Sequence, residues 1–473
     1  MIILKKIVNR LFSTSAAGLY MILFAAAIGV ATFIENDFGT SAAQKVVFKT
    51  KWFELLLVLF GITLIVNIFR FRMIQQKKWA ILTFHAAMVI ILIGAGVTRY
   101  FGFEGMMHIR EGSASDTFLS AETYLLFEAR NGQETFRFDA PVLFASRGNN
   151  HFQETYQLGD KQISVEVTDF MPNPAEVMVD DPVTGVPILK IVIGGMSGRE
   201  EYYLRYGETS TIKGTRFAFG EQPDPTAFSI QYANQELTFV APEPYTQMVM
   251  ATQTRDSIAP GAVYPLRLRS LYSNGTSGFV FGDFNPQARV EITSSSPKML
   301  SSSMGGVLMT ISSGSDRQTQ YVYGQQGVEG RPRGFMVNGM QVAASYGAKR
   351  RQLPFSLQLH DFIMERYPGT NSASSYASEV TLLDPRTKLK RDQRIYMNHI
   401  LDHDGYRFFQ SSFDQDELGT YLSVNYDAPG TWLSYIGYFL LTLGMILTLF
   451  SPKSRFRKLG EHIRQIRQSR VMA

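Results

Sequence analysis

The feature that most constrains this chain is the segment from Trp79 to Phe101, WAILTFHAAMVIILIGAGVTRYF, which is apolar almost throughout. About 20 apolar residues, at roughly 1.5 Å rise each, cross the hydrocarbon core of a bilayer, so the segment predicts a membrane-spanning helix. If the helix enters the membrane near Trp79, His85 lies about 9 Å along it, below the headgroups. Imidazole is costly there unless it is bonded, coordinated or hydrated, so His85 is the first functional candidate. The alternative is a histidine that only packs or bonds against a neighbouring helix.

Three more apolar runs predict three more spans, at residues 16–34, 52–69 and 429–451. The first is too long for the apolar core of a signal peptide, and two spans follow closely, so we expect it to be retained. All three tryptophans, Trp52, Trp79 and Trp432, fall where a run starts, as expected of indole rings at a membrane interface. Residues 1–101 are therefore expected to form three transmembrane helices and residues 429–451 a fourth.

Basic residues flank these runs on one predicted side of the membrane, which fixes orientation by the positive-inside rule. They are Lys5, Lys6, Arg10, Arg70, Arg72, Lys77, Lys78, Lys453, Arg455, Arg457, Lys458, Arg464, Arg467 and Arg470. The N-terminus, the 70–78 turn and the 452–473 tail are thus predicted to be cytoplasmic, although three lysines in the outer 35–51 loop oppose this. The net charge of +5 then reflects orientation, and without a phosphate-binding loop or a zinc-finger spacing we expect no nucleic-acid partner.

Residues 102–428 predict a large extracytoplasmic all-β domain of sandwich or barrel type. Short alternating runs are separated by Gly, Pro, Asn, Asp and Ser, and Asn131-Gly132 is a strong hairpin signal. ISVEVTDF and FSLQLHDF resemble each other, which suggests two related halves joined by a flexible Ser/Gly-rich stretch from Thr293 to Ser315. The chain has no cysteine, so any thiol chemistry must belong to a partner.

The other histidines offer weaker sites. His399 and His403 have a spacing that would suit a metal on a helix, but Asn398, Asp404 and Gly405 predict a turn entering a strand, so a metal site is not favoured. His108 is expected on a solvated loop just outside the third span, and His151, His360 and His462 are expected to be ordinary surface or domain residues. No hydrolase motif is present in the sequence, and alone the chain is expected to be non-catalytic.

Several stretches together resemble the ResB (CcsB) family of cytochrome c biogenesis proteins. They are WFELLLVLFGITLIVNIFRFR, FHAAMVIILIGAGVTRYFGFEGMMHIREG, LPFSLQLHDFIMERYPGT, YASEVTLLD and IYMNHILDHDGYRFFQSSFDQDELGTYLSVNYDAPGTWLSYIG. The order of three spans, a large β domain and one span is also similar to that family. The last stretch is the most specific of these.

The resemblance implies a function that the residues alone do not. Members work with a CcsA-type partner, sometimes fused in one chain, as a haem exporter and holocytochrome c synthase in the cytoplasmic (inner) membrane, with the large domain on the periplasmic side. The histidine matching His85 would ligate the iron of haem b transiently, opposite a histidine of the partner. Apocytochrome c and a thioredoxin-like reductant would be further partners. The partner's tryptophan-rich haem-binding segment is absent here, so this chain resembles one half of the machine, and whether it is the first half of a fusion stays open.

Two other functions remain as alternatives. In one, the chain is a membrane-anchored scaffold whose β domain binds proteins and which handles no cofactor. In the other it transports a small solute, but four spans with one titratable side chain deep inside offer little polar pathway.

Overall fold

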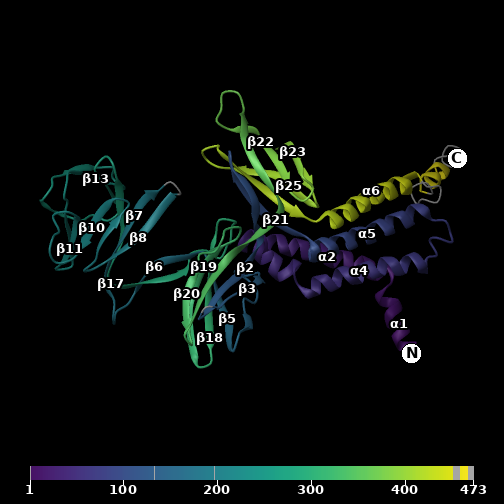
Figure 1. The fold of residues 1–473 in the computed structure, drawn as a ribbon, viewed down its shortest axis with the longest axis horizontal. Coiled ribbons are helices and arrows are strands. Elements are labelled where there is room, and N and C mark those ends of the chain that lie inside the picture. The colour runs from purple at the N-terminus through teal and green to yellow at the C-terminus, as the bar shows by residue number, and fades with distance from the viewer. Residues whose placement is uncertain (1, 133, 196–197, 451–458, 467–473) are drawn as a thin grey trace. The chain divides into compact units, whose positions relative to one another are not determined.

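The computed structural model describes residues 2–132, 134–195, 198–450 and 459–466 (Figure 1). The predicted tail residues Lys453, Arg455, Arg457, Lys458, Arg467 and Arg470 therefore lie outside the described part. The helices are α1 (Ile2–Leu11), α2 (Thr14–Phe38), α3 (Thr40–Ala43), the π-helix η1 (Gln44–Phe48), α4 (Lys51–Arg70), α5 (Trp79–Phe101) and α6 (Ala428–Phe450).

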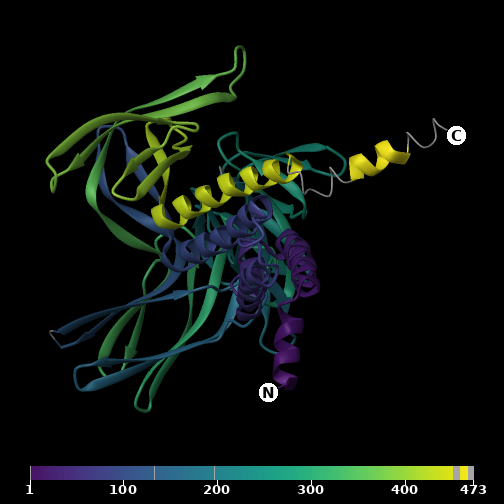
Figure 2. The ribbon, with the colours of Figure 1, turned by 90° about the vertical axis from the view of Figure 1, so that its right-hand side faces the viewer.

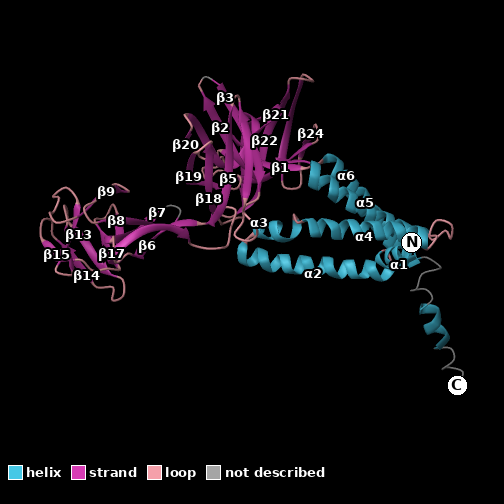
Figure 3. Ribbon diagram, turned by 90° about the horizontal axis from the view of Figure 1, so that it is seen from below, coloured by secondary structure: helices cyan, strands magenta, loops and turns pink. Residues whose placement is uncertain are grey.

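Four of these helices, α2, α4, α5 and α6, are long and apolar enough to cross a membrane. Together with a large all-β part built from several sheets they confirm the predicted fold class (Figure 3). Ser13 starts α2, because its side chain accepts the Ala16 N–H, and Thr50 starts α4 by accepting the Phe53 N–H. The stretch expected as a loop between the first two spans is instead mostly helical, because α2 continues to Phe38 and α3 and η1 follow it.

The chain divides into two compact units, which are described separately. Unit 1 comprises residues 1–173 and 295–473, and unit 2 comprises residues 174–294. Unit 1 holds the helices and two sheets. The ten-stranded sheet contains β1 (Phe103–Arg110), β2 (Ala114–Asn131), β3 (Glu134–Val142), β20 (Arg333–Val337), β21 (Met340–Arg366), β22 (Ala373–Asp384), β23 (Leu389–Tyr396), β24 (Leu401–His403), β25 (Tyr406–Phe413) and β26 (Gly419–Tyr426).

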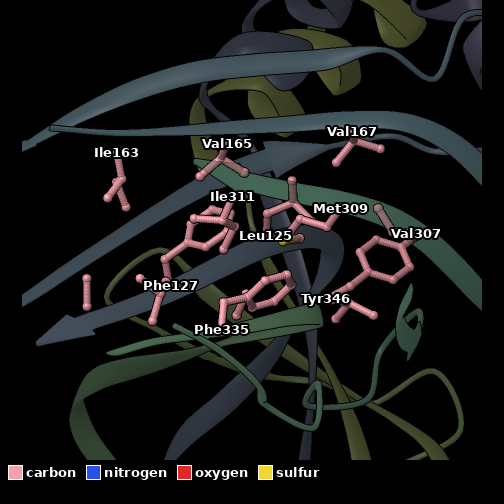
Figure 4. Packing of buried hydrophobic residues seen from close by; sticks show 14 of the residues in the cluster. Leu125, Phe127, Ile163, Val165, Val167, Val307, Met309, Ile311, Phe335 and Tyr346 are labelled. Carbon is pink, nitrogen blue, oxygen red and sulfur yellow. The ribbon is translucent and has the colours of Figure 1, made fainter. Parts of the chain in front are cut away.

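The smaller sheet of unit 1 contains β4 (Phe152–Leu158), β5 (Lys161–Pro172), β18 (Met304–Ser313) and β19 (Asp316–Gln325). Apolar side chains of β5 and β18 pack against those of β2 and β20 in one core, which includes Val165, Ile311, Phe127 and Phe335 (Figure 4). The predicted β2–β3 hairpin is confirmed, with Asn131 opposite Glu134. Each sheet has free edges, so the predicted sandwich or barrel is a set of open sheets, and the described strands close no barrel.

The Ser/Gly-rich stretch expected to be a flexible connection contains β18, which pairs with both β5 and β19. Val307, Met309 and Ile311 in this strand are fully buried. The apolar residues of β18 alternate with small and polar ones, which made this core strand look like a linker. The prediction of a flexible connection was therefore wrong for residues 304–313. The two similar segments lie in β5 and β21, in different sheets of unit 1, and the division of the chain falls elsewhere.

Unit 2 has two sheets and an aromatic core of its own. One sheet contains β6 (Pro174–Asp180), β7 (Val186–Gly195), β8 (Gly198–Arg205), β13 (Tyr245–Val249), β14 (Arg255–Ile258), β16 (Ser270–Ser273) and β17 (Gly278–Ser294), and the other contains β9 (Thr209–Ile212), β10 (Thr215–Phe219), β11 (Phe228–Ala233), β12 (Glu236–Val240) and β15 (Val263–Pro265). Phe217, Phe228, Phe279, Phe281 and Tyr272 are all essentially inaccessible to solvent at its centre. A core of this kind is what an independently folding domain needs.

The ends of unit 1 that flank unit 2 lie next to each other. The Asn173 carbonyl oxygen accepts the Ser295 N–H at 3.0 Å, and the Ser295 hydroxyl bonds to the same oxygen at 2.9 Å. Excision of residues 174–294, with Asn173 joined to Ser295 by a short Gly-Ser linker, should therefore leave unit 1 folded. We expect the variant to melt cooperatively in detergent, within a few degrees of the full chain, and residues 174–294 alone to give a soluble protein with β-type circular dichroism.

A matched control removes a segment that belongs to the core of unit 1. Deletion of residues 304–325 takes away β18 and β19 with their buried Val307, Met309, Ile311 and Val322, and should abolish the cooperative melt. Loss of folding in the 174–294 excision would show that the two units depend on each other.

Candidate functional site

α6 packs along one face of α5. The two helices lie side by side (Figures 1 and 2), and α6 carries Gly430, Gly437 and Gly444 at a spacing of seven residues. A Cβ atom at Gly437 would lie 2.5 Å from the Ile91 side chain, and one at Gly444 would lie 2.8 Å from the Phe84 backbone nitrogen. Glycines at this period let helix backbones approach closely, which is how spans pack where there is no water to exclude.

His85 lies on another side of α5. At roughly 100° per residue it is about 100–160° round the helix from Phe84, Ala87 and Ile91, which form the stripe that meets α6. It shares a side with Leu92, one heptad further on, whose Cδ1 atom would lie 3.5 Å from a Cβ at Gly61 of α4. The imidazole is half-buried. The packing of α6 therefore leaves His85 on the α4-facing side of α5.

The hydrogen bond of His85 decides which of its nitrogens is available. Nδ1 lies 2.9 Å from the carbonyl oxygen of Ile81, one turn earlier. A carbonyl oxygen can only accept, so Nδ1 carries the proton and the neutral ring keeps its lone pair on Nε2. Nε2 has no hydrogen bond or ion pair within the described residues, and the ring of Phe84 meets the imidazole at 68° with centroids 6.1 Å apart. This geometry leaves Nε2 free to bind one axial position of a metal.

A polar pair in the neighbouring span was missed in the sequence. Thr63 and Asn67 of α4 are one turn apart, and both are buried. The Thr63 hydroxyl donates to the Leu59 carbonyl at 2.7 Å, whereas Asn67 Oδ1 has no partner among the described residues. An asparagine inside an apolar run is itself the signal that could have found this position, because an unsatisfied amide in a membrane is costly.

The start of α4 and the end of α5 are fixed to each other by polar contacts. Arg99 forms an ion pair with Glu54 at 2.8 Å and donates to the Phe48 carbonyl at 2.6 Å. The Tyr100 hydroxyl donates to the same Glu54 carboxylate at 2.7 Å. These contacts hold the end of α5 against the start of α4. They therefore keep the face of α5 that carries Arg99 and His85 turned towards α4.

The connection between α2 and α4 is anchored in the β part of unit 1. The ammonium group of Lys45, in η1, donates to the Leu143 carbonyl at 2.6 Å and to Asn150 Oδ1 at 2.5 Å. The Arg147 guanidinium lies over the Phe38 ring, 4.3 Å from its centroid. Burial, without a neighbouring carboxylate, lowers the pKa of Lys45 to about 8.

Other histidines are engaged by the sheet. His108, expected on a loop, lies in β1 because the strand begins at Phe103. Its Nε2 is 2.8 Å from Asp414 Oδ2, and its ring stacks on Tyr421.

The His403 ring forms a hydrogen bond with Asp384. Hydrogen bonds from Arg386 and then His403 hold the pKa of the Asp384 carboxyl well below its usual range. His399 stacks on Tyr396 instead, so the pair does not converge. Within the described residues no group of three or more His, Cys, Asp or Glu side chains could hold a metal.

His360 lies in β21 and its Nε2 is 2.6 Å from the Thr381 hydroxyl. His151 follows a turn in which its backbone N–H is bonded to Asn149, and His462 lies in the short helical stretch 459–466. None of the three shares a contact with His85. The structure therefore does not bring a second histidine to it.

Comparison with known proteins confirms the predicted resemblance. The model of the ResB-like family matches residues 75–157 and 328–426, which include α5 with His85, β1 to β3 and the strands from β21 to β26. Protein NrfI of Wolinella succinogenes is 28% identical over 447 residues, covering 94% of this chain. The chain spans 35% of the length of that relative. Both matches show that the chain is similar to ResB-like proteins over α5 and much of the ten-stranded sheet.

Substitution of Gly437 by valine should loosen the α5–α6 pair, since the new side chain would enter the space of Ile91 and the Ala87 carbonyl. Overpacking of this kind costs about 1–3 kcal/mol, which thermal unfolding in detergent should register as a lower melting temperature. Gly96→Val is the matched control, because a Cβ there meets nothing within 4 Å. Equal destabilisation by the two variants would contradict the assigned interface.

Lys45 should give the protein a pH dependence above neutrality. Its pKa is depressed from 10.5 to about 8 in the folded state, so below pH 8 the burial cost of the charge is fully present. Between pH 8 and 10.5 the unfolded chain holds the proton and the folded chain does not, so this group's contribution to stability rises with pH. The melting temperature of the wild type relative to Lys45→Met should rise over this range. A constant difference between the two would show that Lys45 titrates normally.

Proposed function

Because a ResB-like family model matches residues 75–157 and 328–426, we propose that this chain is a membrane subunit of the cytochrome c maturation machinery. In this proposal it helps to export haem and to present it for attachment to apocytochrome c, together with a CcsA-type partner. The proposal assigns one residue of this chain to the cofactor. His85 holds the iron of haem b on its way through the membrane.

The observation that supports this assignment is the tautomer of His85. The Ile81 carbonyl fixes the proton on Nδ1 at 2.9 Å, and this leaves Nε2 as a neutral donor of the kind that binds haem iron. Such a backbone bond also orients a ligating imidazole and raises its basicity. The residues present therefore fit an axial ligand, and haem bound there would supply the porphyrin that is later joined to the cytochrome thiols.

One imidazole fills one axial position, which explains why a partner is required. His108, His360, His399 and His403 bond or stack elsewhere, and the resemblance to the ResB family implies that a histidine of the CcsA-type partner would supply the second ligand. His85, half-buried on α5, would hold the haem iron from this chain. Unpaired Asn67 in α4 adds a polar group to the same membrane part.

The position of the machinery follows from the charge distribution. The basic 70–78 turn lies on the cytoplasmic side in this proposal, and the β sheets lie on the periplasmic side of the inner membrane. A chain without cysteine cannot reduce the cytochrome thiols, so a thioredoxin-like protein supplies reduced apocytochrome c. The open sheets of unit 1 provide the surface that faces these partners.

The test is the absorption spectrum of the protein purified with its CcsA-type partner. His85→Gly should lower haem content on the order of tenfold, because the axial bond is lost, and added imidazole should restore it by entering the space of the missing side chain. His151→Gly is the matched control, because it also removes a histidine but lies in the β part of unit 1.

Normal haem content in His85→Gly, without a response to imidazole, would overturn the axial role. A haem stain of membranes separates the wider alternatives. If deletion of the gene left c-type cytochromes intact, the chain would be a scaffold that handles no cofactor.

A further inference from the structure

A cavity lined by both charged and apolar side chains lies in unit 1 where the membrane-spanning helices meet the sheets. It has a volume of about 420 Å³ and is bounded by Thr98 in the last turn of α5, Lys49 before α4, and Glu122 of β2. It adjoins a second cavity of about 920 Å³, because Gln44, Glu104, Asn425 and other residues line both. At ~30 Å³ per water molecule the first alone has room for on the order of a dozen non-hydrogen atoms.

The charges in the first cavity are unbalanced. Glu104, Glu122 and Asp427 face a single lysine, Lys49. Lys49 and Glu122 form a loose pair, with 3.7 Å between Nζ and Oε1, and about half of each side chain is exposed. Glu122 reaches the cavity because β2 slips its register against β21 between Leu119 and Thr123. The lining therefore has an excess of negative charge, and its single ammonium group, that of Lys49, is only weakly paired.

Asp427 has an unmet hydrogen-bonding need. The residue is 7% exposed, and its Oδ2 accepts the Thr98 hydroxyl at 2.5 Å. Its Oδ1 is buried and has no partner among the described residues. A buried carboxylate oxygen without a donor is destabilising, so the site favours a ligand that brings N–H groups and positive charge.

The position of the cavity relative to the membrane limits which molecules can supply that ligand. Thr98 and Lys49 adjoin the ends of two spans, which places the cavity at the membrane interface whichever side the sheets occupy. At this level the abundant group with both a primary ammonium and a phosphate is a phospholipid headgroup. Anionic headgroups are disfavoured by the three carboxylates, and a choline headgroup has no N–H to offer Asp427.

We propose that this cavity binds the headgroup of phosphatidylethanolamine, with its ammonium at the Asp427 carboxylate and its phosphate at Lys49. The bound lipid would join the ends of α5 and α6 to the α2–α4 connection. This site involves neither His85 nor haem, so it stands or fails independently of the function proposed above.

The test measures the melting temperature of the full chain after delipidation in detergent. Dihexanoyl phosphatidylethanolamine should raise it by about 3 °C or more, whereas dihexanoyl phosphatidylcholine and phosphatidylglycerol should give at most a third of that rise. Asp427→Asn should abolish the ethanolamine-specific rise, and Asp416→Asn, an exposed aspartate paired with Arg110, should retain it. An equal rise with all three lipids, or a full rise in Asp427→Asn, would overturn the proposal.

Two further arms keep the result decisive. Free phosphoethanolamine tests a soluble source, and a full rise from it alone would overturn the lipid assignment. If Asp427→Asn fails to fold, Lys49→Met takes its place because it removes the proposed phosphate partner, and mass spectrometry of the lipids that co-purify should show a several-fold lower share of phosphatidylethanolamine than in the wild type. An unchanged share would count against the site.

Discussion

Two membrane helices of this protein are continuous with two paired strands, and the rest of unit 1 depends on that continuity. α5 ends at Phe101 and β1 begins at Phe103, with Gly102 alone between them, while β26 ends at Tyr426 and α6 begins at Ala428. β1 and β26 pair along their whole length, from Phe103 opposite Tyr426 to Arg110 opposite Gly419. A Cβ at Gly102 would lie 2.6 Å from the Thr98 carbonyl oxygen, so glycine is required at this link.

The same constraint explains the glycines of α6. Strand pairing brings two chains to about 5 Å, whereas ordinary helices pack 8–10 Å apart. Gly430, Gly437 and Gly444 let α6 stay near α5 along its length, and the Thr98–Asp427 hydrogen bond closes the transition. With one side of α5 committed to α6, the polar side chain of His85 must lie on another side. Its place towards α4 therefore follows from the geometry of the strand pair.

The sequence could predict features that depend on neighbours along the chain. The four spans follow from the length of apolar runs, and the β2–β3 hairpin follows from Asn131-Gly132 between alternating segments. The sequence could not predict unit 2, because residues 174–294 have the same strand-like character as their surroundings and differ only in which strands they pair with. The prediction for β18 was wrong for a related reason. Its buried Val307, Met309 and Ile311 alternate with residues that by themselves favour a linker.

The candidate site shows the same limit. Hydropathy alone places His85 inside a span, but it cannot say which nitrogen carries the proton, since that depends on the distance to the Ile81 carbonyl. The histidines of the sheet differ from His85, because a carboxylate within the chain bonds each ring. His403 bonds the buried Asp384, and His108 bonds Asp414. Their rings complete polar networks, largely buried at His403 and partly exposed at His108, and such networks stabilise the strands that hold them. His85 has only a backbone bond on one nitrogen, so its remaining lone pair has no structural task within the described residues. A polar atom kept in a membrane without such a task is the observation on which the proposed ligand role of His85 rests.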